Sequence, residues 1–112
     1  MIDIMNTGNL DFIVKVAACV CGKDGLISQV EEMAIFSSVS SEFPNYTFVS
    51  FNKALDEFFD ENLQIEDYLQ HISDHALKSF TVQVCEHSAS ADGLDIKENI
   101  ALHKVKLVLG AI

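Results

Sequence analysis

Residues 23–35, KDGLISQVEEMAI, share a pattern with residues 91–102, ADGLDIKENIAL, near the other end of the chain. Each segment has an Asp-Gly pair, a small polar residue, a glutamate three positions after it, and then apolar residues. The Asp-Gly pair is typical of a turn, because glycine accepts a positive φ and aspartate hydrogen-bonds the neighbouring backbone. Ser28 and Glu31 have the spacing of a capping box, which begins a helix. Each segment therefore predicts a turn followed by a helix.

The second segment has its capping box at Asp95 and Glu98, one residue closer to the Asp-Gly pair than in the first segment. If one residue is deleted from the second turn, the helices that follow the two turns match in register. The aligned positions are Met33 with Ile100, Ala34 with Ala101, and Ile35 with Leu102. Agreement across turn, cap and helix predicts an internal duplication of a helix–turn–helix unit.

The rest of the chain also has the apolar spacing of helices, and no segment alternates as a strand does. A helix from about Asn9 to Cys21 is apolar on nearly every side and is expected in the middle of a bundle. Four further helices are predicted after it and before the Asp95 cap. They begin at Ser28, at about Thr47, at Ile65 and at Asp74. The sequence therefore predicts a single all-α domain over residues 1–112.

The inward faces of these helices are predicted from their apolar residues. The apolar side of the second helix has Val30, Met33, Ala34 and Ile35, the stripe of the third has Phe48, Phe51, Leu55, Phe58 and Phe59, and Leu77, Phe80 and Val84 face inward from the fifth. Ile65, Tyr68, Leu69 and Ile72 mark the short fourth helix, and the apolar residues of the last helix are Ile96, Ile100, Leu107 and Val108.

Composition indicates a packed protein, since 49% of the 112 residues are apolar and only 5 are Gly and 1 is Pro. Acidic residues outnumber basic ones by 17 to 7, and the formal net charge is -10. Such a surface repels nucleic acids and anionic lipids and attracts cations or a basic protein partner. No basic region precedes the apolar run 12–21, which contains Lys15 and is too short to span a bilayer. We therefore expect no membrane insertion and a cytoplasmic location, with the oligomeric state left open.

The four acidic residues of the repeat have two interpretations. Asp24, Glu31, Asp92 and Glu98 carry hard oxygen ligands, which suit Ca²⁺ or Mg²⁺. Alternatively, they serve only as turn and cap residues. A calcium EF-hand is not expected, because Val20 and the glycine two residues after it stand where that loop needs carboxylates.

Other candidate sites are weaker. His71 and His75 are four residues apart and would hold Zn²⁺ or Ni²⁺ on a continuous helix, but a cap at Asp74 would separate them. The acidic run 56–62 is typical of a solvated helix face and would also attract a basic partner. The three cysteines form no CxxC pair, so reduced, buried thiols are expected. No nucleophile elbow or phosphate-binding glycine loop occurs, and an enzyme is not expected.

Residues 19–36, CVCGKDGLISQVEEMAIF, and 85–110, CEHSASADGLDIKENIALHKVKLVLG, resemble the TerB-like (tellurite resistance protein B) domain. The resemblance implies a multihelical bundle with an internal duplication, and with helices of about 9–21 and 74–86 at its centre. It also implies metal binding by clustered acidic residues, which here are Asp24, Glu31, Asp92 and Glu98. The one-residue deletion before Glu98 departs from the family pattern.

Members of that family are associated with resistance to tellurite and other chemical stresses and with phage-related phenotypes. The domain also occurs attached to a membrane-anchored DnaJ-type co-chaperone, so a basic or membrane-associated protein partner is expected. Direct binding of the tellurite oxyanion is not expected at a net charge of -10. The expected function is thus a non-enzymatic cation-binding domain in a stress response. The alternative is a protein-interaction module without metal.

Overall fold

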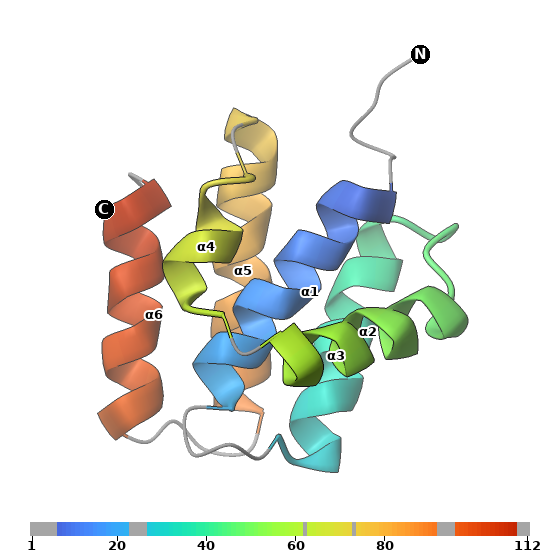
Figure 1. Cartoon of the computed structure of the whole chain (residues 1–112), viewed down its shortest axis with the longest axis horizontal. Helices are drawn as coiled ribbons and strands as arrows, with labels where there is room; N and C mark the ends of the chain where they lie inside the picture. Colours follow the sequence, from blue (N-terminus) through green and yellow to red (C-terminus); the bar gives the residue numbers. More distant parts are fainter. Residues whose placement is uncertain (1–6, 23–26, 62, 73, 92–95, 110–112) are drawn as a thin grey trace.

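The computed structural model describes residues 7–22, 27–61, 63–72, 74–91 and 96–109. These residues contain six helices, joined by turns and short connections, and no strand occurs among them. The helices are α1 Thr7–Cys21, α2 Gln29–Glu42, α3 Phe48–Glu61, α4 Ile65–Leu69, α5 His75–Ser90 and α6 Ile96–Leu109 (Figure 1). The all-α prediction is confirmed. The radius of gyration is 12.5 Å, as expected for a compact chain of about this length.

Helices α1 and α5 form the centre of the bundle (Figure 1). Residues on all sides of α1 are buried, including Ile13, Val16 and Val20, each 0% exposed. The prediction that this helix lies in the middle of a bundle is confirmed. Helix α5 contributes Val84 and Cys85 to the same core and packs against α1, α2 and α6.

The helices flanking the two Asp-Gly segments end at the same side of the bundle. In Figure 1, α1 and α5 both end at the bottom, and α2 and α6 both begin there. The pairs α1–α2 and α5–α6 are therefore two antiparallel hairpins, and they pack together through the contact between α1 and α5. Helix α3 crosses α1, while α4 contacts both α1 and α6.

Local side-chain hydrogen bonds explain where two of the helices begin. Ser28 Oγ accepts a hydrogen bond from the Glu31 N–H at 3.1 Å, and Glu31 Oε1 accepts one from the Ser28 N–H at 3.1 Å. This confirms the first capping box. Asp74 caps α5 as predicted, since its Oδ1 accepts hydrogen bonds from the N–H groups of Ala76 and Leu77. The second predicted cap, Asp95, lies outside the described residues.

Several predicted core positions are wrong. Val30 and Met33 of α2 are 53% and 48% exposed, and Phe48 and Phe59 of α3 are 47% and 53% exposed. In α6 the exposed residues include Ile100, Leu107 and Val108, at 64%, 60% and 50%. Apolar residues occur on more than one face of α2 and α6, so periodicity alone did not select the inward face. In α2 the predicted residues Ala34 and Ile35 are buried, together with Glu31 and Val39. In α6 the buried residues are Ala101, Leu102, Val105 and Leu109.

Within the part of the chain that the structure describes, every helix is too short or too polar to cross a membrane.

Candidate functional site

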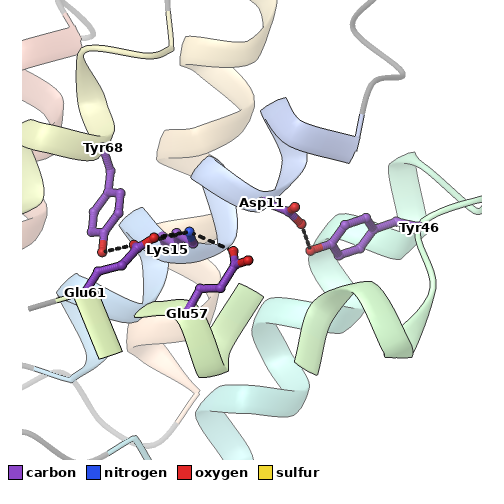
Figure 2. A network of polar contacts seen from close by, with 6 residues as sticks. All are labelled: Asp11, Lys15, Tyr46, Glu57, Glu61 and Tyr68. Carbon is purple, nitrogen blue, oxygen red and sulfur yellow. Dashed lines mark hydrogen bonds and ion pairs between the residues drawn. The ribbon is translucent and has the colours of Figure 1, made fainter. Parts of the chain in front are cut away.

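A lysine inside the bundle organises a network of polar contacts between helices. Lys15 lies in α1, and its side chain is only 7% exposed. Its Nζ lies 3.1 Å from Glu57 Oε1 and 3.2 Å from both carboxylate oxygens of Glu61. Figure 2 shows the two glutamates reaching α1 from successive turns of α3. The side chains of Glu57 and Glu61 are 43% and 35% exposed, so the carboxylates connect the buried ammonium to solvent.

Two aromatic rings complete the surroundings of the Lys15 ammonium. The Tyr68 hydroxyl donates a hydrogen bond to Glu61 Oε1 at 2.9 Å (Figure 2). The Lys15 Nζ lies 5.7 Å from the centre of the Tyr68 ring and 5.9 Å from that of Phe12. Both distances are within the range of a cation–π interaction. The network thus links α1, α3 and α4.

A second polar contact lies one helical turn before Lys15. The Tyr46 hydroxyl donates a hydrogen bond to Asp11 Oδ1 at 2.8 Å (Figure 2). Tyr46 is 2% exposed and belongs to the connection between α2 and α3. This bond therefore fixes that connection against the first half of α1.

The protonation states in this network are set by burial and by neighbouring charges. Burial alone lowers the pKa of Lys15, but the hydrogen bonds to Glu57 and Glu61 outweigh burial and leave that pKa raised. Burial and the hydrogen bond to Glu61 raise the pKa of Tyr68, and burial and Asp11 do the same for Tyr46.

Lys15 is therefore an ammonium at neutral pH, and not a nucleophile or a general base. Every buried side-chain nitrogen and oxygen among the described residues has a hydrogen-bond partner. The network consequently acts as a structural clamp between helices.

Asp11 provides a pH test of this network. Burial raises the pKa of Asp11, and this effect outweighs the hydrogen bond from Tyr46, which lowers it. The folded state thus holds the Asp11 proton more tightly than the unfolded state, so the contribution of Asp11 to stability is largest below about pH 4. That contribution falls as the pH rises through the raised pKa.

We therefore expect Asp11→Asn to lower the free energy of unfolding less at about pH 7 than below about pH 4, in each case relative to wild type at the same pH. Urea unfolding of both proteins at each pH measures this difference. Tyr46→Phe is the control, because loss of its hydrogen bond should raise the pKa of Asp11 further. A difference that is independent of pH would contradict the raised pKa.

A cavity of about 270 Å³ lies between the end of α1, the α3–α4 connection and α6. Most of the residues around it are apolar. They are Cys19, Gly22, Phe58, Leu63, Gln64, Ile65, Ile100, Ala101 and Lys104. Gly22, which follows the end of α1, and Ile100, in the first half of α6, are far apart in the sequence but line the same cavity.

The predicted cation ligands are only partly described. Asp24 and Asp92 lie outside the described residues, and Glu98 lies in α6 without a described side chain. Glu31 is 4% exposed and uses one carboxylate oxygen in the capping box with Ser28. Among the described residues, no group of three or more His, Cys, Asp or Glu side chains is placed to hold a metal ion.

The condition for a site at His71 and His75, a continuous helix, is not met. Helix α4 ends at Leu69 and α5 begins at His75 after the Asp74 cap, so the two histidines do not share a helix. The His71 ring instead stacks on Phe12, with ring centres 4.2 Å apart and planes 8° from parallel.

None of the three cysteines, all of which lie in described helices, forms a disulfide. Cys21 and Cys85 are buried, as predicted, while Cys19 is half-buried at the cavity. Burial raises the pKa of the Cys85 thiol well above its usual value. Cys85 is therefore a thiol at neutral pH, and not a reactive thiolate.

Sequence reasoning missed the polar network, although one signal for it was present. A single lysine in the middle of an otherwise apolar helix predicts a buried charge that needs a carboxylate partner. Which of the 17 acidic residues would be that partner was not predictable from local pattern.

Comparisons of the chain with models of known protein families, with curated proteins and with solved structures found no significant match.

Proposed function

We propose that this chain is a non-enzymatic TerB-like domain that binds a divalent cation, Ca²⁺ or Mg²⁺, through Asp24, Glu31, Asp92 and Glu98, in a cytoplasmic response to chemical stress. The observation that carries the proposal is the position of the helix ends. The ends of α1 and α5 and the beginnings of α2 and α6, which flank the two acidic segments, lie at the same side of the bundle (Figure 1).

The burial of the aligned residues supports the duplication. Met33 and Ile100 are both exposed, at 48% and 64%. The pairs that follow are buried in both copies: Ala34 and Ala101 at 9% and 4%, and Ile35 and Leu102 at 0% and 6%. The central position of α1 and α5 also agrees with the architecture that the resemblance implies.

The chemistry of Glu31 is compatible with a cation. Its capping box uses Oε1, and a carboxylate has a second oxygen that can accept a ligand. The net charge of -10 also favours the attraction of a cation to this protein.

The second candidate is a protein-interaction module in which the acidic turns are only structural. The burial of Glu31 and its capping box with Ser28 favour this alternative, because both are explained without a metal ion. The exposed apolar residues of α2, α3 and α6 favour it as well.

Titration with Ca²⁺ and Mg²⁺, followed by amide NMR shifts, distinguishes the two candidates. We expect saturable shifts around Asp24, Glu31, Asp92 and Glu98 in the wild type, and their loss in Asp24→Asn/Asp92→Asn. The free energy of unfolding should rise by about 2.7 kcal/mol when the cation is present at 100 times its Kd.

The matched control is Asp56→Asn/Asp60→Asn, which removes the same charge from two exposed residues of α3. This control should bind the cation like the wild type. A flat titration of the wild type would reject the cation site and leave the interaction module. Equal loss of binding in both double variants would instead indicate diffuse attraction by the net charge.

A further inference from the structure

The cavity beside α6 has the size of a site for one apolar side chain, and part of its wall is apolar. Its volume is about 270 Å³, whereas an apolar protein cavity of about 150 Å³ already accepts benzene. Phe58, Leu63, Ile65 and Ile100 provide apolar walls from α3, the α3–α4 connection, α4 and α6. A leucine or phenylalanine side chain would therefore be covered on several sides.

The cavity opens to solvent among exposed apolar residues. Leu63 and Ile100, which line it, are 47% and 64% exposed. Large apolar side chains gathered at the opening of a cavity are typical of a binding surface.

The charges in this region favour a basic ligand. Residues 56–67 contain six acidic residues and no lysine or arginine. Lys15 neutralises part of the charge of Glu57 and Glu61, and Lys104 forms an ion pair with Glu66. Asp56 and Asp60 are exposed, and the acidic residues of the segment outnumber these two lysines.

We propose that this cavity is the docking site for a basic segment of a partner protein, which inserts one large apolar side chain and places lysine or arginine residues against the acidic segment 56–67. A second copy of this chain fits poorly, because two copies would each bring a net charge of -10 and the same acidic region. The interaction is independent of the proposed cation site.

Cys19 is a natural reporter for this site. It lines the cavity and is half-buried, whereas Cys21 and Cys85 are 4% and 0% exposed. N-ethylmaleimide should therefore react first at Cys19 in the folded protein. An apolar side chain in the cavity should protect Cys19 and slow that reaction.

Three synthetic peptides test the proposal on the full chain, with a chelator present so that cations do not contribute. The first peptide has one leucine between two lysine runs, the second has serine in place of the leucine, and the third has glutamate in place of every lysine. We expect only the first peptide to bind saturably and to slow the alkylation of Cys19, by about tenfold or more at saturation. Its affinity should fall as salt rises.

Two double variants locate the site. Leu63→Ser/Ile100→Ser removes apolar groups at the opening and should weaken binding of the leucine peptide about tenfold. Val49→Ser/Leu107→Ser is the matched control, because these residues are 78% and 60% exposed and do not line the cavity. It should bind the peptide like the wild type.

Equal binding of the leucine and serine peptides without protection of Cys19 would overturn the proposal, since it would show attraction by charge alone. Absence of binding by all three peptides would also overturn it. Equal weakening in the two double variants would place the peptide elsewhere on the surface and reject the cavity as its site.

Discussion

Exchanging both Glu57 and Glu61 for glutamine is expected to lower the free energy of unfolding by about 2–3 kcal/mol. The Lys15 ammonium, with its side chain 7% exposed, would then lie in the bundle without an opposite charge. Removing one side of a buried ion pair costs about 3–5 kcal/mol. The carboxylates of Glu57 and Glu61 are 43% and 35% exposed. Solvent screens charges that are this exposed, so the expected loss is below that range, at about 2–3 kcal/mol.

Urea unfolding measures this loss, and a third substitution tests its cause. Lys15→Met in the double variant removes the unpaired ammonium and should restore much of the stability, because the charge is replaced by an apolar side chain of similar length. Asp56→Asn/Asp60→Asn removes two acidic residues of α3 outside this network and should change stability by less than about 0.5 kcal/mol. If Lys15→Met lowered stability further, the buried charge would not be the cause.

The ion pair also has a predicted pH dependence. The pKa of Lys15 is raised in the folded state, so its contribution to stability is complete below the unfolded pKa of about 10.4. The contribution is lost as the pH rises through the raised pKa. The stability difference between wild type and the double glutamine variant should therefore be constant near neutral pH and shrink above about pH 10.5.

The substitution Phe51→Ala is expected to have the largest effect on stability, a loss of about 3–5 kcal/mol. Phe51 is 0% exposed, and its ring centre lies 5.3 Å from that of Phe36 and 5.8 Å from that of Phe48. Alanine would leave a cavity where α2, α3 and α1 meet, and the surrounding helices would close it only in part.

Phe59→Ala is the control on the same helix, because Phe59 is 53% exposed. In the wild type the Phe59 ring makes one aromatic contact, with the Phe58 ring at 5.2 Å between centres. Loss of this contact should lower the free energy of unfolding by about 0.5–1 kcal/mol. Equilibrium unfolding in urea compares the two variants. Similar losses at the two positions would contradict the assignment of Phe51 to the core.

The helices and their beginnings were predictable because they depend on residues close together in the chain. The capping box of Ser28 and Glu31 and the cap at Asp74 are formed within three residues, and both are present. The inward face of α6 was not predictable. Ile100, Ala101 and Leu102 are adjacent apolar residues on different sides of the helix, and contact with the rest of the bundle decides which are covered.

The candidate sites likewise differ in whether the local sequence pattern predicts them. The repeated acidic segments were visible in the sequence, but Asp24 and Asp92 lie outside the described residues, so their use as ligands stays a prediction. The partners of Lys15 are 42 and 46 residues away in the chain, and the cavity is lined by residues from both ends. No local pattern identifies either feature.

The sequence by itself determined the helical class, the position of each helix and the caps at Ser28 and Asp74, because hydrogen bonds between near neighbours specify them. Only the tertiary structure decided which apolar residues stay exposed, which carboxylates neutralise Lys15, and where the cavity beside Ile100 lies. These features arise where helices distant in the chain come into contact, and the free energy of burying a residue depends on what covers it.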